Sequence, residues 1–347
     1  MKIELWGTYP PPIGGVTIHI LRLIHSLHKL DPKIILKDFG GVASEYSYIV
    51  PVKNKCWEFC RLLFLPTKII HLHSNNVNAF LLLLLLGWNH RIGLTIHNKN
   101  LVKVKSAWKR IVIKWFLQRA SFIILNDDGY RRQLIECFHC KEERMHILPA
   151  FLPPVEIEYQ GLGGDIIGFR NQHDFLVSAN AYKLRLEDDV DVYGLDLLIR
   201  LVADLKMAGI DVGLIFCLPM IGDSAYYEKC IATIEKQHLQ DNILIVQKPL
   251  PNGFEVWQLS DLFIRPTSTD IEGISVKEAL YCGTPAIASD VCKRPPEAIL
   301  FKNRNYEDLE EKVLDFYYHR ELYSTSNFKC DGGVESQLMD IYRTLNK

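Results

Sequence analysis

The sequence predicts an α/β protein with two doubly wound, Rossmann-like domains. Three observations support this prediction. The chain has 347 residues, enough for two domains of ordinary size. Short apolar runs alternate with amphipathic stretches of helical length in both halves, which is typical of βα units around a parallel sheet. Residues 149–172 contain Pro153, Pro154, Gly161, Gly163 and Gly164, which separate the two halves.

The strands are expected at the apolar runs, and the helices at the amphipathic stretches between them. The expected strands of the first half are residues 3–6, 34–36, 69–73, 93–97, 122–125 and 145–148. Those of the second half are 174–179, 212–218, 242–246, 262–265 and 285–288. Helices of the length that right-handed crossovers need are expected at 16–29, 193–207, 224–237, 275–281 and 334–345.

Composition argues against several classes of protein. With 48% hydrophobic and 23% charged residues, neither a disordered chain nor a membrane-spanning one is expected. The longest apolar stretch, 79–88, contains six consecutive leucines but is shorter than the roughly 20 residues of a spanning helix, so we expect a buried helix. Nine cysteines, an odd number, and an N-terminus that resembles a strand rather than a signal segment suggest reduced thiols in the cytoplasm.

A glycine pair follows the first expected strand. Gly14 and Gly15 stand where a strand turns into a helix, so their N–H groups and the helix N-terminus could face a phosphate. A tight turn without a ligand is the alternative. The turn lacks the glycine spacing of dinucleotide-binding proteins and the Lys-Ser/Thr of a P-loop, which disfavours dehydrogenases and NTPases.

The most informative stretch is residues 265–290. Asp270 is expected in a loop after a strand, and Glu278 eight positions later in the next helix. Ligands of doubly wound sheets bind at the carboxyl ends of the strands, so both carboxylates could accept hydrogen bonds from sugar hydroxyls. Alternatively, Asp270 caps the helix and Glu278 is solvated.

This stretch resembles the C-terminal motif of glycosyltransferase family 4 (group 1), which are retaining, nucleotide-sugar-dependent enzymes of the GT-B fold. The acidic pair resembles their Glu-x7-Glu signature with Asp first, and residues 278–289 continue it with a Glu-Ala-Leu-x-x-Gly-x-Pro-x-Ile-Ala-Ser run. Gly14-Gly15 resembles the family's glycine loop, and residues 94–98 resemble its strand ending in an active-site histidine, here His97.

The resemblance implies two Rossmann-like domains with a cleft between them. Residues 1–165 would bind the acceptor, 166–330 would bind the nucleotide sugar, and 331–347 would form a helix that crosses back to the first domain. The implied activity is retaining transfer of a sugar from a UDP- or GDP-type donor to a glycan or lipid-linked glycan, in bacterial capsule or lipopolysaccharide synthesis. No metal or other cofactor is expected.

The resemblance also assigns roles to residues. Glu278 would hold the ribose, and Asp270 with the backbone of Glu272, Gly273 and Ile274 would hold the donor sugar. The N–H groups of Gly14 and Gly15 and the helix N-terminus near Ser275 would face the diphosphate. His97 would lie near the reacting centre.

One departure from the family concerns the diphosphate. The family usually places an Arg and a Lys after the first strand of the second domain, where this chain has Asn180 and Tyr193. Lys183 and Arg185 are the candidate replacements, with solvated loop residues as the alternative, and Arg265 is a further candidate cation. This departure keeps a non-catalytic nucleotide- or membrane-binding scaffold open, and a GT-B epimerase acting without an acceptor is a second alternative.

A basic stretch follows His97. Residues 99–119 contain no acidic residue, and apolar residues including Trp108 and Trp115 interleave with the basic ones at helical spacing. Such a helix suits an anionic membrane surface, although it could simply pack on the first domain with solvated lysines. Nucleic acid is a poorer match, because no recognised module accompanies it. The basic residues are Lys99, Lys103, Lys105, Lys109, Arg110, Lys114 and Arg119.

His19 and four of the cysteines are further candidate site residues, but the sequence does not support a functional role for them. His19, on the helix after the glycine pair, is expected to be a packed or surface residue without a role. The cysteines at 56, 60, 137 and 140 lack the paired spacing of zinc sites and are expected to be structural or incidental.

Overall fold

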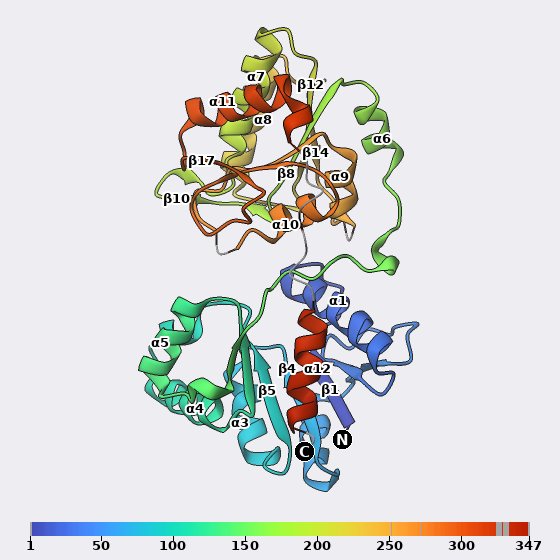
Figure 1. Ribbon diagram of the computed structural model, residues 1–347, viewed down its shortest axis with the longest axis vertical. Helices are drawn as coiled ribbons and strands as arrows, with labels where there is room; N and C mark the ends of the chain where they lie inside the picture. The colour runs from blue at the N-terminus through green and yellow to red at the C-terminus, as the bar shows by residue number, and fades with distance from the viewer. Residues whose placement is uncertain (1, 251, 271, 324–327, 329–332, 346–347) are drawn as a thin grey trace. The chain divides into compact units, whose positions relative to one another are not determined.

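The computed structural model describes residues 2–250, 252–270, 272–323, 328 and 333–345. The chain divides into two compact units (Figure 1). The first comprises Met1–Leu152 with Asp331–Lys347, and the second comprises Pro153–Cys330. Both are parallel sheets with helical crossovers, so the predicted α/β class is confirmed.

The first unit contains a seven-stranded parallel sheet. Its strand order is β3-β2-β1-β4-β5-β6-β7, so the first strand lies in the interior and the chain winds outward from it in both directions. The strands are β1 (Lys2–Gly7), β2 (Ile35–Asp38), β3 (Ile49–Pro51), β4 (Lys68–Leu72), β5 (Arg91–Thr95), β6 (Phe122–Leu125) and β7 (Met145–Ile147).

Helix α1 (Gly15–Leu30) of this unit is amphipathic and buries one face against the sheet. In α1 the buried Ile20, Leu23, Ile24 and Leu27 recur at the spacing of one helix face. The other helices are α2 (Lys55–Cys60), α3 (Val77–Leu86), α4 (Ala107–Arg119), α5 (Asp128–Phe138) and α12 (Val334–Leu345).

The last helix, α12, packs beside α1 (Figure 1). Its buried side chains, Val334, Leu338, Met339 and Tyr342, join the core of β1, β2 and α1. The Tyr342 hydroxyl also lies 2.6 Å from His71 Nδ1. The hydrophobic core of the first unit therefore contains residues from both the beginning and the end of the chain.

The second unit contains a six-stranded parallel sheet of order β14-β12-β8-β15-β16-β17. Two short ribbons, β9 (Lys183–Leu184) with β13 (Met220–Gly222) and β10 (Leu186–Glu187) with β11 (Val190–Asp191), lie outside it. The six strands are β8 (Phe175–Asn180), β12 (Val212–Cys217), β14 (Ile243–Val246), β15 (Leu262–Arg265), β16 (Ala286–Ser289) and β17 (Ile299–Phe301).

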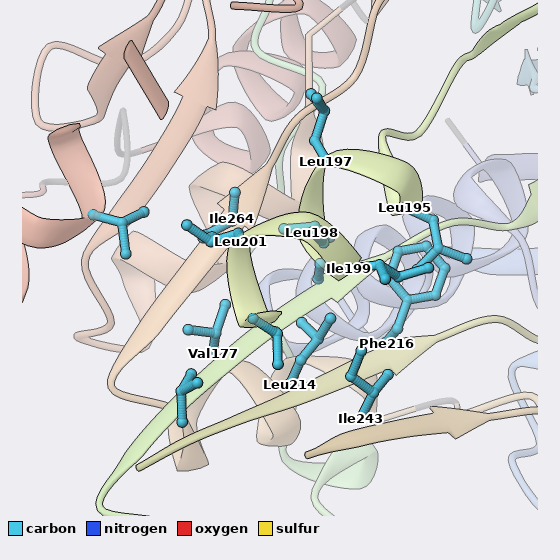
Figure 2. Packing of buried hydrophobic residues seen from close by; sticks show 14 of the residues in the cluster. Val177, Leu195, Leu197, Leu198, Ile199, Leu201, Leu214, Phe216, Ile243 and Ile264 are labelled. Atoms are coloured by element: carbon cyan, nitrogen blue, oxygen red, sulfur yellow. The ribbon is translucent and has the colours of Figure 1, made fainter. Parts of the chain in front are cut away.

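Helix α7 shows how this sheet is covered. Its leucines, including Leu198 and Leu201, pack with Val177 of β8 and Leu214 of β12 in one fully buried cluster, as Figure 2 shows. The helices of the unit are α6 (Gly164–Arg170), α7 (Leu195–Met207), α8 (Ser224–Lys236), α9 (Gly253–Leu259), α10 (Ile274–Tyr281) and α11 (Tyr306–Tyr318).

The division between the units falls after Leu152, within residues 149–172, where the sequence predicted the boundary. It lies nearer the start of that stretch than residue 165, the end chosen for the first domain. Hydrogen bonds explain the difference, because the N–H groups of Gln160 and Gly161 both donate to Glu255, at 3.2 Å each. The segment before residue 165 is thereby attached to the second unit.

The leucine-rich segment is helical, but the prediction that it is buried is wrong for part of α3. Phe80 and Leu83 are buried, whereas Leu85 is 63% exposed. Helix α3 packs with α2 and α4, and these contacts leave its remaining face open. Within the described residues, no helix combines the length and apolarity that crossing a bilayer requires.

Candidate functional site

Each sheet has a topological switch point, where the chain reverses its direction of winding. In the second unit it lies between β8 and β15, and in the first between β1 and β4. Ligands of open α/β sheets bind outside the carboxyl ends of the strands at such points. Many of the residues singled out from the sequence follow these strand ends.

Arg265 lies at the switch point of the second unit, at the carboxyl end of β15. Its Nη1 donates to both the backbone oxygen and Oδ1 of Asn180, at 3.1 and 3.0 Å, and Asn180 ends the neighbouring β8. Its Nε donates to Asp270 Oδ2 at 3.2 Å. Two adjacent strand ends and the acidic loop are thus joined by one guanidinium.

A second arginine, Arg294, was missed by sequence reasoning. Its side chain is fully buried, and Nη1 lies 3.0 Å from Asp270 Oδ2. Its Nε donates to the backbone oxygen of Ser289 at 3.1 Å, and Nη2 donates to Thr267 Oγ1 at 3.3 Å. Arg294 stands 24 residues from Asp270 in a segment without a recognisable motif, so only the fold brings the pair together.

The two arginines determine the charge of Asp270. Burial by itself would raise the pKa of this carboxyl, but Arg265 and Arg294 outweigh burial and hold the pKa below its ordinary value. Asp270 is therefore ionised at neutral pH. The cluster formed by Asp270, Arg265 and Arg294 carries a net charge of +1 because the arginines stay protonated.

The loop after Asp270 depends on a glycine. Gly273 caps α10 with φ +67°, and a Cβ there would lie 1.9 Å from Arg294 Nη1. Only glycine combines this backbone with so close a guanidinium. Ile274 and Ser275 begin α10 directly after Gly273, at the helix N-terminus, where the first N–H groups have no carbonyl partner within an α-helix.

Two further carboxylates belong to this region. Glu278 on α10 is half-buried, and the indole N–H of Trp257 lies 3.4 Å from its Oε2. Glu272, before Gly273, forms an ion pair with Lys277 at 2.6 Å. The expected donor-binding residues of 265–278 are therefore close in space as well as in sequence.

The candidate cations Lys183 and Arg185 have a different environment. Both side chains are exposed, and Arg185 pairs with Glu187 at 2.9 Å. Within the described residues, no ion pair links either to Asp270. Tyr193, where the family has its lysine, instead lies 5.6 Å from the Arg265 guanidinium, in cation–π geometry.

The first unit presents histidines at its switch point. Gly14 caps α1, and Gly15 begins it, with open space where a Cβ would point. His19 follows on α1, while His73 and His97 follow β4 and β5. The structure brings together His97, which the sequence singled out, and His19, which it did not.

These three histidines form a compact cluster. His73 Nδ1 and His97 Nε2 are 3.2 Å apart, and His19 Nδ1 lies 3.0 Å from the backbone oxygen of Ala150. Their donor atoms lie within 4.8 Å of one another, and in the described part of the chain this is the group that could hold a metal ion together. Imidazole nitrogens suit zinc and related transition metals.

Burial keeps His73 and His97 uncharged. It lowers the pKa of His73 and of His97 well below the ordinary value, and neighbouring histidines lower both further. Behind them, His71 is buried between Tyr342 and Thr95, and its pKa falls to about 3. His73 and His97 therefore offer neutral hydrogen-bonding groups at pH 7.

Comparison with known proteins shows what the second unit is similar to. Residues 184–325 match the family model described as glycosyl transferases group 1. An uncharacterized glycosyltransferase of Methanocaldococcus jannaschii is 22% identical, over 94% of this chain and 91% of the relative. The comparisons support a group 1 glycosyltransferase.

Solved structures show that the likeness in fold extends over the whole chain. HepE of Anabaena, determined in complex with UDP, has a TM-score of 0.67 at 15% identity, covering 100% of this chain and 98% of HepE. Sucrose-phosphate synthase of Thermosynechococcus elongatus has a TM-score of 0.67 at 14% identity, covering 100% and 99%. The predicted GT-B fold is thus confirmed.

The glycosyltransferase match contains the charged cluster but not the histidines. Arg265, Asp270 and Arg294 lie within the matched segment, whereas His19, His73 and His97 lie outside it. The family signal therefore comes from the unit expected to bind the donor.

Proposed function

We propose that this protein is a retaining glycosyltransferase of family 4, which transfers a sugar from a UDP- or GDP-type donor to a glycan or lipid-linked glycan. The proposed setting is bacterial surface polysaccharide synthesis at the cytoplasmic face of the membrane. The observation that carries the proposal is the cluster of Arg265, Asp270 and Arg294 at the switch point beside α10.

The donor is proposed to bind across this cluster. Glu278 would accept hydrogen bonds from the ribose hydroxyls, and Asp270 with the backbone of 272–274 would orient the sugar. The start of α10 at Ser275 and the Gly14-Gly15 turn would supply N–H groups for the diphosphate. These roles follow the resemblance, and the positions of Asp270 and Glu278 around one helix start support them.

Positive charge at the diphosphate is the main chemical requirement. Cleavage of the glycosyl–phosphate bond leaves negative charge on the departing diphosphate, so a fixed cation there lowers the barrier. Arg265 is the best candidate, because Asn180 and Asp270 already fix its orientation. The cluster's net positive charge supports transfer without a metal, and activity should persist in EDTA.

His97 would then act as a hydrogen-bond partner rather than a base. Its lowered pKa makes it a weak proton acceptor at neutral pH. In a retaining reaction without a protein nucleophile, the leaving phosphate would take the acceptor's proton. His97 would therefore orient a sugar hydroxyl near the reacting centre.

Membrane contact by the first unit is part of the proposal. The inner face of α4 is buried through Val112 and Phe116, but Trp108 and Trp115 are 51% and 61% exposed. Helix α3 packs beside α4 and exposes Leu85. Exposed tryptophans flanked by lysines suit the interface of an anionic bilayer.

Vesicle binding tests this contact. The purified protein should bind phosphatidylglycerol-containing vesicles at low salt, and changing Trp108 and Trp115 to serine should weaken that binding. Met207→Ser is the matched control, because Met207 is a similarly exposed apolar residue on the other unit. Equal binding by both variants would remove the membrane from the proposal.

Donor binding is tested by thermal stabilisation with UDP, GDP and their sugar conjugates. A ligand at 100 times its Kd should stabilise the protein by about 2.7 kcal/mol. Glu278→Ala should abolish the shift, whereas Glu311→Ala, on the exposed side of α11, should keep it. No shift with any nucleotide would favour a non-catalytic scaffold.

The products distinguish the enzyme classes. With a bound donor sugar, transfer to an acceptor with the anomeric configuration kept, observed by NMR, supports the proposal. An isomerised nucleotide sugar without any acceptor would instead identify an epimerase.

A further inference from the structure

The first unit has a cavity at the edge of its sheet opposite the histidines. The cavity has a volume of about 340 Å³. Arg91 begins β5, Ser121 precedes β6, and Arg144 precedes β7, so the cavity lies at the amino ends of three neighbouring strands. Arg119, at the end of α4, and Trp88, after α3, also line it, together with His90 and Leu345.

The lining is strongly cationic. Arg91, Arg119 and Arg144 converge on the cavity, and none of them forms an ion pair with a carboxylate in the described part of the chain. Three guanidiniums around one space repel each other unless an anion occupies it. Among the described residues, these three arginines therefore lack the carboxylate partner that a surface arginine usually has.

Two of these arginines have a partial structural role. Arg119 Nη2 donates to the backbone oxygen of Gly87, which caps α3, at 2.9 Å. Arg144 Nη1 donates to the backbone oxygens of Gln118 and Ala120 at the end of α4, at 3.3 and 3.1 Å. Each bond uses one nitrogen, so both guanidiniums are fixed in orientation while most of their donors remain available.

Arg91 and Ser121, unlike Arg119 and Arg144, do not cap the end of a helix. Among the described residues, neither the Arg91 side chain nor the Ser121 hydroxyl has a hydrogen-bond or ion-pair partner. Burial also lowers the pKa of Arg119, which indicates that its charge is poorly solvated as it stands. Unused donors therefore surround the cavity together with uncompensated charge.

We propose that this cavity binds a phosphate group. Guanidiniums recognise phosphate oxygens through paired N–H donors, and the Ser121 hydroxyl adds another. The volume lies within the range of small-ligand sites. The phosphate belongs either to a soluble phosphate compound or to the headgroup of an anionic lipid, whose glycerol would lie along the exposed Trp88.

This site is separate from the proposed donor site. The donor cluster follows strand carboxyl ends in the second unit, whereas this cavity lies at strand amino ends in the first. The inference therefore does not depend on sugar transfer. It names a second anion site that sequence motifs gave no sign of.

Arg91→Gln is the decisive variant, because it removes a charge that caps nothing. Binding is measured by calorimetry with inorganic phosphate and glycerol phosphate, and by flotation with vesicles of phosphatidylcholine, with and without phosphatidylglycerol. We expect saturable binding that Arg91→Gln weakens about tenfold or more. The matched control is Arg132→Gln, on the exposed side of α5, which should bind like the native protein.

The two kinds of binding measurement distinguish a soluble phosphate compound from a lipid headgroup. Arg91-dependent binding of the soluble compounds identifies a free phosphate ligand, and Arg91-dependent binding of anionic vesicles alone identifies a lipid headgroup. Arg265→Gln should leave either result unchanged while it impairs UDP binding, which keeps this test apart from that of the donor site. No saturable binding of any probe, or equal binding by the Arg91 and Arg132 variants, would overturn the proposal.

Discussion

The two units share one winding pattern but place opposite kinds of group at the switch point. In both sheets the first strand is flanked by the second and the fourth major strand, so their polar clusters occupy equivalent places. The first unit has neutral histidines there, and the second has an ionised aspartate between two arginines. The scaffold fixes where these polar clusters lie, and the residues after the strands fix the charge of each cluster.

Burial acts on both clusters, with opposite results. It suppresses protonation of His73 and His97, which have no carboxylate partner among the described contacts of the cluster. For Asp270, Arg265 and Arg294 outweigh the effect of burial and keep the carboxyl charged. An uncharged site suits sugar hydroxyls and a charged one suits a nucleotide diphosphate, which supports the proposed division of acceptor and donor between the units.

The largest expected effect comes from Arg294→Met, which breaks the buried ion pair. Asp270 would lose a fully buried partner, so the second unit should lose about 3 kcal/mol of stability. Hydrogen exchange of peptides from each unit measures the loss, which should be confined to the second. Asp270→Asn combined with Arg294→Met should not recover it, because Arg265 is then left without its carboxylate partner. A loss below about 1 kcal/mol would contradict this account.

Arg265→Gln should affect chemistry more than folding. Glutamine can keep a hydrogen bond to Asn180 but not the positive charge, so kcat should fall about 100-fold, equivalent to about 2.7 kcal/mol. Steady-state kinetics with a nucleotide sugar provide the measurement. Arg200→Gln, an exposed arginine on α7, is the control. Unchanged kcat would exclude Arg265 as the diphosphate cation.

Acid should weaken the first unit selectively. The pKa of His71 is about 3 in the folded protein and about 6.5 when unfolded, so its stabilising effect is complete above pH 6.5 and is lost as pH falls toward 3. At pH 5 the expected loss is about 2 kcal/mol from this residue. Exchange at pH 7 and pH 5, corrected for intrinsic rates, should show faster global opening in the first unit, and equal change in both units would refute the comparison.

The sequence predicted what periodicity and short motifs encode. Strands such as β6 and β15 were predicted with the bounds they have, because apolar runs between polar breaks define them. The strands β3 and β17 were not predicted, whereas β7, which is as short, was. Arg294 and His19 join their clusters only through tertiary contacts, which local patterns do not contain.

The smallest expected effect on kcat comes from Lys183 and Arg185, which the sequence analysis proposed as replacements for the family's Arg and Lys. Lys183 and Arg185 are exposed, and solvent screening limits what such charges contribute to less than about 1 kcal/mol. Changing both to alanine should therefore lower kcat less than about fivefold, far below the effect of Arg265→Gln. Both variants are compared at saturating donor, so that differences in donor affinity do not enter. A 100-fold fall of kcat in the double variant would mean that the β9 segment moves onto the diphosphate when the donor binds. The positive charge for catalysis would then come from Lys183 and Arg185 rather than from the preformed cluster of Arg265, Asp270 and Arg294.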